Sequence, residues 1–381
     1  MKNEVTLIAT ATMGLEALVA KEVRALGYDN VKTENGKVEF TGPYSAIART
    51  NLWLRTADRV KIKVAEFNAF SFDELFEKTK AAPWEEFLPE NAEFPVTGRS
   101  VKSTLFSISD CQAIVKKAVV EKLKKTYHTD WFKENGALYK IEVALHKDIA
   151  TLTIDTSGEG LHKRGYRPLH SRAPLKETLA AAMIMLTNWK PDKPFADPLC
   201  GSGTIPIEAA LIGQNIAPGF NRKFAAEAWP WMPQNIWDEA REEAEASADY
   251  EQLLDIQGSD IDHNNVKLAE ENAMEAGLFD VVSFKQMQVA DFYSKGEYGC
   301  LVTNPPYGER LYDKKEVEAL YKSMGQSFTE HLPTWSVYVI TSHQDFEKLY
   351  GKKASKKRKL YNGNIKTDYY QFFGPRPPRR K

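Results

Sequence analysis

The second half of the chain alternates short apolar runs with helical segments, and this alternation constrains the fold more than any other feature. Each run is three to five residues long and is followed by a helical pattern, as in successive βαβ units. The strand-like runs are residues 195–197, 256–260, 281–284, 300–303 and 337–341, and the helical segments are 175–189, 204–213, 263–276 and 316–331. The pattern predicts an α/β domain with a mainly parallel, doubly wound sheet.

The first 165 residues mix strands and helices without this regular alternation. Residues 1–65 predict a small α+β module, with a strand at 4–9, a helix at 14–26 and a hairpin at 31–40 that turns at Asn35-Gly36. Residues 66–160 predict a second α+β unit, with strands at 94–96 and 103–108, a helix at 111–123 and a hairpin from 139 to 154. The glycine-rich, basic segment 158–172 is typical of a linker, and the α/β domain is expected over 165–381.

The composition is that of a soluble globular protein, with 43% hydrophobic and 27% charged residues and a net charge of -1. We see no apolar run long enough to cross a membrane and no secretory signal, so we expect a cytoplasmic protein. The three cysteines are far apart, which indicates neither disulfides nor a metal site. Positive charge is local: residues 351–381 hold eleven Lys or Arg and one acid, a pattern that suits phosphate binding or a solubilising tail.

The segment after the strand-like run 195–197 is a candidate cofactor loop. Small residues let a ligand approach the backbone there, and the following helix places a partial positive charge at its N-terminus. It matches neither a phosphate loop, because no lysine follows, nor the glycine spacing of dinucleotide-binding enzymes. An acid at the strand end suits the amino group or methionyl part of a cationic sulfonium cofactor. The candidate residues are Asp197, Pro198, Cys200, Gly201, Ser202, Gly203 and Thr204.

A second acidic segment, Gly258-Ser259-Asp260-Ile261-Asp262, ends the next strand-like run. A carboxylate in this place accepts hydrogen bonds from ribose hydroxyls in nucleoside-binding folds. Asp260 is the first choice for that contact and Asp262 the second, since Asp262 also suits the N-cap of the following helix.

The third segment, residues 304–310 (Asn-Pro-Pro-Tyr-Gly-Glu-Arg), carries the most specific chemistry. An exocyclic base amine is a poor nucleophile because its lone pair is delocalised into the ring. The Asn304 oxygen and a backbone carbonyl, expected at Pro305, would accept both amine hydrogens and favour a pyramidal nitrogen. Pro306 restricts the backbone of Pro305, and Tyr307 offers a face for base stacking. These four residues are the predicted catalytic set, with positioning and electrostatics supplying much of the rate.

Together these segments resemble those of the THUMP-domain RNA guanine-N2 methyltransferases, most of all the large-subunit ribosomal RNA enzymes. Residues 161–167, 173–179, 217–219 and 359–363 also resemble family segments. The resemblance implies a ferredoxin-like module, an RNA-binding THUMP domain and a class I Rossmann-like methyltransferase domain that uses S-adenosyl-L-methionine. It implies that the cofactor contacts include the loop residues above, Asp260, Ile261 and Asn304. An acid usually binds the adenine amine, and here Gln288 takes that place, with Asp291 as the alternative.

Other functions remain open at this point. The amine-methylation motif also serves N6-adenine methylation of DNA, glutamine methylation of release factors, and guanine-N2 methylation of tRNA. A non-catalytic RNA-binding assembly factor is a further alternative, whereas the glycine spacing argues against a nicotinamide oxidoreductase. The resemblance implies a flipped-out target base, and we expect a monomer that binds RNA. The aromatic segment 228–233 is expected either to pack on the fold or to stack on RNA.

Overall fold

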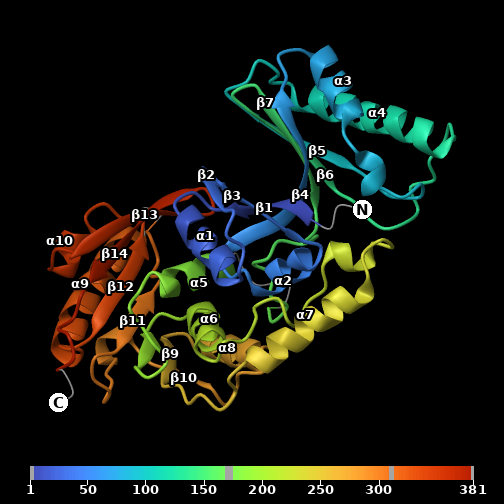
Figure 1. Ribbon diagram of the computed structural model, residues 1–381. Helices are drawn as coiled ribbons and strands as arrows, with labels where there is room; N and C mark the ends of the chain where they lie inside the picture. The colour runs from blue at the N-terminus through green and yellow to red at the C-terminus, as the bar shows by residue number, and fades with distance from the viewer. Residues whose placement is uncertain (1–3, 168–174, 309–312, 379–381) are drawn as a thin grey trace. The chain divides into compact units, whose positions relative to one another are not determined.

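The structure is a computed structural model that describes residues 4–167, 175–308 and 313–378 (Figure 1). The chain forms two compact units. The first contains the described residues up to Ala11, then Val19–Leu161 and Arg222–Glu243. The second contains Thr12–Leu18, His162–Asn221 and the described residues from Ala244 onward. Each unit is therefore assembled from segments that are discontinuous in sequence.

The first unit is built on a single seven-stranded sheet in the order β2-β3-β1-β4-β7-β6-β5. All its neighbouring strands are antiparallel except β5 and β6, which are parallel. The strands are β1 (Glu4–Ala11), β2 (Lys32–Glu34), β3 (Lys37–Pro43), β4 (Ala57–Asn68), β5 (Val96–Val101), β6 (Ile141–His146) and β7 (Ile149–Asp155).

The long strand β4 joins the two α+β modules that the sequence pattern predicts. Its first half pairs with β1, from Ala57 to Ile62, and its second half pairs with β7, from Lys61 to Asn68. The expected module boundary at residue 65 lies within this strand. The two modules therefore share one hydrogen-bonded sheet.

The helices associated with this unit are α1 (Glu16–Ala25), α2 (Ser45–Trp53), α3 (Phe72–Ala81), α4 (Ile108–Tyr127) and α7 (Gln234–Ser247), with short 3-10 turns η1 (Trp84–Glu86) and η2 (Ala225–Ala228). Helix α3 begins at Ser71, whose side chain accepts a hydrogen bond from the backbone N–H of Glu74. This contact satisfies one of the unpaired donors at the helix start. Buried Trp84, Trp229 and Trp237 contribute to the core of this unit.

The aromatic segment 228–233 packs within the first unit. Trp229 is 1% exposed, stacks on Tyr139 with 4.6 Å between ring centroids, and donates a hydrogen bond to the Leu138 carbonyl. The indole N–H of Trp231 donates to the Phe87 carbonyl at 2.8 Å. Of the two expected roles for this segment, the structure supports packing, and the indole N–H groups are satisfied as buried donors must be.

The second unit contains the predicted doubly wound sheet, in the order β10-β9-β8-β11-β12-β14-β13. The first five of these strands are parallel, and the last two are antiparallel to their neighbours. The strands are β8 (Phe195–Asp197), β9 (Ile256–Asp260), β10 (Val282–Gln286), β11 (Cys300–Thr303), β12 (Ser336–Thr341), β13 (Lys356–Asn362) and β14 (Ile365–Phe372). The order changes direction at β8, which lies between β9 and β11.

Helices cover both faces of this sheet (Figure 1). One apolar cluster joins the sheet to α5 (Glu177–Met185), α6 (Thr204–Gly213) and α8 (His263–Glu275). The other joins it to α9 (Asp313–His331) and α10 (Phe346–Tyr350). A short 3-10 turn, η3 (Val289–Asp291), follows β10. In open sheets of this kind, ligands bind beyond the carboxyl ends of the strands where the order reverses, here at β8, β9 and β11.

Three expected elements are wrong in extent or type. The strand expected at 94–96 begins only at its last residue and covers Val96–Val101. Residues 103–108 do not form a strand: β5 ends at Val101, and the loop is held by hydrogen bonds from Ser100 Oγ to the Leu105 carbonyl and from the Thr104 N–H to Asp148. The helix expected over 175–189 covers only Glu177–Met185. Thr187 ends it, since its hydroxyl bonds to the Ile184 carbonyl and accepts from the Trp189 N–H, a local alternative to helical pairing.

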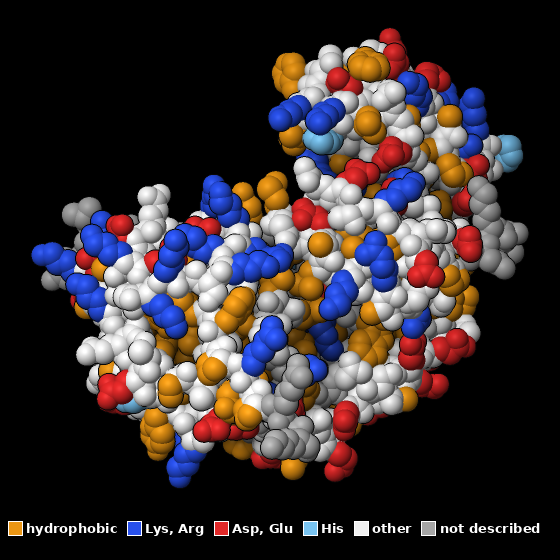
Figure 2. Space-filling model, turned by 60° about the vertical axis from the view of Figure 1, so that its left-hand side comes forward, with side chains coloured by type: hydrophobic (Ala, Val, Ile, Leu, Met, Phe, Trp, Pro, Cys, Tyr) orange, Lys and Arg blue, Asp and Glu red, His pale blue; other side chains and the backbone are white. Residues whose placement is uncertain are grey.

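The basic C-terminal region folds through Phe372 as the β13–β14 hairpin. Figure 2 shows Lys and Arg side chains interspersed with Asp and Glu on the face that it draws. None of the helices in the described ranges is both long enough and apolar enough to cross a membrane.

Gly325 gives a stability prediction, because helix α9 approaches α10 closely at this residue. A Cβ at position 325 would collide with the carbonyl oxygen of Tyr350 and lie 2.7 Å from its carbonyl carbon. Helix propensity alone would make Gly325→Ala stabilising by about 1 kcal/mol. Overpacking costs about 1–3 kcal/mol, and a direct collision with backbone belongs in the upper part of that range, so we expect a net loss of about 1–2 kcal/mol.

Urea unfolding of Gly325→Ala and of the exposed-site control Lys322→Ala would measure this effect. The control should change the free energy of unfolding by less than about 0.5 kcal/mol. A Gly325→Ala protein that is as stable as the wild type would show that α9 and α10 do not pack in the way described.

Candidate active site

The buried carboxylate of Asp197 lies at the carboxyl end of β8, where the candidate cofactor loop begins. Asp197 is 1% exposed, and its Oδ1 accepts hydrogen bonds from the Thr303 hydroxyl at 2.6 Å and from the Leu199 N–H at 3.1 Å. Burial raises the pKa of Asp197 to about 7, and the nearby charge of Asp260 adds to this shift. The two hydrogen bonds act in the opposite direction, so this group titrates near neutral pH.

The loop that follows is shaped by glycines in left-handed conformations. Gly201 and Gly203 have φ angles of +50° and +78°, which side-chain-bearing residues rarely adopt. A Cβ at Gly203 would lie 2.9 Å from the Ala269 methyl group, whereas a Cβ at Gly201 would meet nothing within 4 Å. One glycine therefore permits close packing on α8, and the other leaves open space beside the loop.

Asp260 ties the end of β9 to this loop. Its Oδ2 accepts a hydrogen bond from the Gly201 N–H at 3.0 Å, and its Oδ1 accepts from the Asp262 N–H and from the Asn265 side chain. A carboxylate has about four acceptor positions, so these three bonds leave about one for a ligand hydroxyl. Asp262 caps α8 by accepting from the Asn264 N–H, which is the structural role expected as the alternative.

The Asn304–Tyr307 segment follows β11 at the same edge of the sheet. The Tyr307 hydroxyl donates to Asn304 Oδ1 at 2.7 Å, and the Tyr321 hydroxyl donates to the Pro306 carbonyl at 2.7 Å. Asn304 and Tyr307 are half-buried and Pro305 is buried. Tyr321 is fully buried on α9, and burial raises its pKa to about 12, so it stays a hydrogen-bond donor at neutral pH.

Glu309 and Arg310, the last residues of this motif, lie outside the described residues, as do Ala173 and Pro174 of the family-like segment 173–179.

Sequence reasoning missed a set of residues that support the start of α6. Arg167 donates to the Thr204 hydroxyl at 2.9 Å and forms an ion pair with Glu177 at 2.8 Å. Arg164 pairs with Glu208 inside the fold, where both side chains are at most 2% exposed. A buried pair of this kind fixes an arrangement rather than adding much stability. The sequence signal that could have indicated these buried ion pairs is the run of charged residues in 162–167. Such a run is also typical of a solvated linker.

Gln288 and Ile261, two further predicted cofactor contacts, are both exposed. Gln288 is exposed and precedes η3, and its carbonyl accepts from the Asp291 N–H at 3.0 Å. Ile261 is 61% exposed, and its carbonyl accepts from the Gln286 side chain. Their roles, and the choice between Gln288 and Asp291 for the adenine contact, stay predictions.

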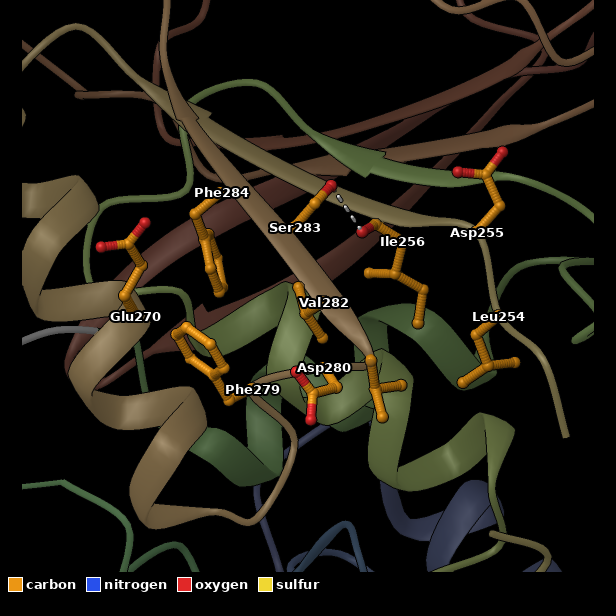
Figure 3. A pocket seen from close by; sticks show the side chains of 10 residues that line it. Leu254, Asp255, Ile256, Glu270, Phe279, Asp280, Val282, Ser283 and Phe284 are labelled. Carbon is orange, nitrogen blue, oxygen red and sulfur yellow. Dashed lines mark hydrogen bonds between the residues drawn. The ribbon is translucent and has the colours of Figure 1, made fainter. Parts of the chain in front are cut away.

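An open pocket of about 400 Å³ lies elsewhere in this unit, around the starts of β9 and β10 (Figure 3). Leu254, Ile256, Phe279 and Val282 supply apolar contacts, and Ser283 Oγ donates to the Ile256 carbonyl. None of the predicted cofactor or catalytic residues lines it. Within the described part of the chain, no group of three or more His, Cys, Asp or Glu side chains is placed to hold a metal ion.

Comparison with known proteins identifies the fold and the family. Residues 164–371 match the model described as "RMKL-like, methyltransferase domain", residues 6–61 match "RlmL ferredoxin-like domain", and residues 69–155 match "THUMP domain". The chain belongs to the RMKL-like methyltransferase family. The three domains implied by the resemblance are therefore confirmed, and so is the class I methyltransferase fold.

Two curated relatives align over essentially the whole chain. "Putative RNA methyltransferase YpsC" of Bacillus subtilis (strain 168) is 63% identical over 99% of this chain and 98% of its own length. "Ribosomal RNA large subunit methyltransferase K/L" of Syntrophotalea carbinolica is 36% identical over 100% of this chain. The chain spans only 56% of that second relative.

Two solved structures have the same fold throughout. The structure of "SMU.472, a putative methyltransferase complexed with SAH" is 52% identical, with a TM-score of 0.94 over 99% of this chain and all of that chain. A Listeria monocytogenes (str. 4b F2365) structure described as a "predicted N6-adenine-specific DNA methylase" is 61% identical, with a TM-score of 0.94 over 98% and 97% of the two chains. With the family, these findings confirm S-adenosylmethionine as the cofactor.

The described residues fit this cofactor. Gly201 leaves open space beside the loop, Asp260 retains an acceptor position, and α6 begins directly after the loop, where no side chain caps the helix. We propose that Asp197 and Asp260 hold the methionyl and ribose ends, respectively. The bound cofactor supplies an electrophilic methyl group, and the chain supplies its orientation.

The pKa of Asp197 gives a pH prediction for cofactor binding. The positive charges of S-adenosylmethionine favour the ionised carboxylate, whereas the free protein holds Asp197 largely protonated below its pKa of about 7. The Kd should therefore fall as the pH rises from 5.5 to 7, by at most about tenfold per pH unit. Isothermal titration calorimetry in two buffers should detect proton release at pH 6.

Asp197→Asn should flatten this pH dependence, and the control Asp255→Asn, at an exposed position before β9, should retain it. A wild-type Kd that does not change between pH 5.5 and 7 would rule out a titrating contact between Asp197 and the cofactor.

Proposed function

We propose that this protein methylates the exocyclic N2 amine of a guanine in RNA, and that the RNA is 23S ribosomal RNA of the large subunit. The hydrogen-bonded pair of Asn304 and Tyr307 at the end of β11 carries the proposal, because this geometry suits an exocyclic amine. The choice of ribosomal RNA is supported by the whole-chain alignment with the K/L relative.

The catalytic contribution of the chain is to hold the amine. We assign Asn304 Oδ1 and the Pro305 carbonyl as acceptors for the two amine hydrogens, which directs the nitrogen lone pair away from the ring plane. Pro306 restrains the backbone of Pro305, and the bond from Tyr321 to the Pro306 carbonyl anchors the same turn to α9. The Tyr307 ring offers a stacking face for the base.

The reaction needs no strong base in this scheme. The nitrogen loses its proton after it has received the methyl group, when that proton is acidic. The chain therefore contributes orientation and fixed dipoles, which are the main sources of rate enhancement when reactants are already bound. The polar groups at this edge are preorganised by the bonds among β8, β9 and β11.

Two features support RNA as the substrate class. The THUMP match covers residues 69–155 of the first unit. In the second unit, the β13–β14 hairpin carries exposed Lys356, Lys359 and Lys366, and the Asn362 side chain at its turn contacts Tyr307. Exposed cations on this hairpin suit contacts with phosphates, which dominate the affinity of nucleic-acid complexes. We further propose that the protein acts as a monomer in the cytoplasm.

A second candidate is N6-adenine methylation, favoured by the description of the Listeria structure and by the same motif chemistry. Methylation of a tRNA guanine is a third. All three reactions use the same residues, so the product distinguishes them and the geometry of Asn304 does not.

We expect isotope from labelled S-adenosylmethionine to appear in N2-methylguanosine when the protein is incubated with unmodified 23S ribosomal RNA, as measured by nucleoside mass spectrometry. Asn304→Ala should lower kcat by about 100-fold or more, because an acceptor for the reacting amine is lost. Asn235→Ala, at an exposed site on α7, is the matched control and should retain wild-type kcat.

Parallel incubations with tRNA and duplex DNA assign the substrate. Label in N6-methyladenine alone would overturn the guanine assignment, and label in tRNA alone would overturn the ribosomal one. Full activity of Asn304→Ala would contradict the proposed catalytic role.

A further inference from the structure

The side chain of Asn362 reaches the catalytic turn from the C-terminal hairpin. Asn362 is the last residue of β13 and pairs with Ile365, the first residue of β14, across a tight turn in which Gly363 has a φ of +61°. Its side-chain nitrogen Nδ2 lies 3.2 Å from the Tyr307 hydroxyl oxygen. The strand register thus places a polar side chain from residue 362 against a residue of the Asn304–Tyr307 turn.

The chemistry of the three groups gives these bonds a direction. An amide nitrogen only donates, so the Tyr307 oxygen accepts from Asn362. The Tyr307 hydrogen then points to Asn304 Oδ1, 2.7 Å away. The bonds run from Asn362 through Tyr307 to Asn304, and they end on an oxygen that has a second lone pair.

This direction decides which atom Asn304 presents to Tyr307. If the Asn304 amide were turned over, its NH₂ group would face the Tyr307 oxygen, which already receives the NH₂ group of Asn362. The Tyr307 hydrogen would then lose Asn304 as its acceptor. The donor at Asn362 therefore favours the orientation in which Asn304 keeps its oxygen in place.

We propose that Asn362 is a positioning residue for the methylation reaction: by donating to Tyr307 it holds Asn304 Oδ1 in the orientation that accepts an amine hydrogen. This inference rests on the proposed function, since it assumes that Asn304 binds the reacting amine. Tyr307 then has two roles, as a stacking face and as the group that relays the hydrogen-bond direction.

The test compares Asn362→Ala, which removes the donor, with Asn362→Asp, which replaces it with an acceptor of the same shape. A carboxylate at 362 takes the Tyr307 hydrogen, so the Tyr307 oxygen is left to accept from Asn304 and favours the turned-over amide. We expect kcat to fall about tenfold more in Asn362→Asp than in Asn362→Ala, with KM for RNA and Kd for S-adenosylmethionine within twofold of wild type. A role in shape alone predicts the reverse order, because aspartate is the closer mimic.

The pH profile provides a second readout. The carboxyl group introduced by Asn362→Asp donates again once it is protonated, so the ratio of kcat for this variant to kcat for the wild type should rise as the pH falls from 7.5 to 5.5. Asn364→Asp, exposed in the same turn, is the matched control, and its ratio should stay near one. A flat ratio for Asn362→Asp, or a kcat no lower than that of Asn362→Ala, would overturn the proposal.

A third measurement needs no substrate and separates this inference from the proposed function. Asn362→Ala should lower Tm in the wild-type background and leave it nearly unchanged in a Tyr307→Phe background, because the bond it removes is already absent there. Equal Tm shifts in both backgrounds would disprove the relay, whichever substrate is found. The wild type could instead fail to methylate every nucleic acid tested while Asn362→Ala lowers Tm only when Tyr307 is present. That result would contradict the proposed function and still support the hydrogen-bond relay from Asn362 to Asn304.

Discussion

The buried hydrogen bond between Thr303 and Asp197 is the interaction on which the site depends. It joins the carboxyl ends of β8 and β11. The loop that follows β8 is joined to β9 by the bond from the Gly201 N–H to Asp260. Three segments that are distant in sequence are therefore held together within hydrogen-bonding distance. A buried polar group without its partner costs about 1–3 kcal/mol, so this edge has one strongly preferred arrangement. That arrangement joins the candidate cofactor loop, which begins at Asp197, to the strand end that precedes Asn304.

The parts of the molecule that could be predicted from the sequence are those with a strong local signal. Periodicity placed all five parallel strands, because each is a short apolar run followed by a helix. The motifs at 197–204, 258–262 and 304–307 lie at one edge as expected, since parallel strands end on the same side. The structure also shows the structural role expected for Asp262, which caps α8. The ligand contacts of Gln288 and Ile261 remain predictions.

What could not be predicted depends on contacts between distant residues. The β13–β14 hairpin was hidden in a run of lysines, and its strand character comes from pairing with β12. The helix at 175–189 stops early because Thr187 forms local bonds that apolar periodicity does not register. Arg167 and Glu208 look like solvated charges in sequence, yet they bond to Thr204 and Arg164 inside the fold. The Asn362 contact likewise exists only once the hairpin register is known.

The discontinuous make-up of the two units bears on how the protein can be made. The segment Arg222–Glu243 belongs to the first unit and supplies Trp229 and Trp237 to its core, yet it is translated after His162–Asn221 of the second unit. Domains commonly fold in order as they emerge from the ribosome. The first unit, however, lacks part of its core until Arg222–Glu243 has been translated, and the apolar surface that Trp229 and Trp237 cover stays exposed until then. A chain truncated after Leu161 would keep this exposed apolar surface and lose the two tryptophans that cover it.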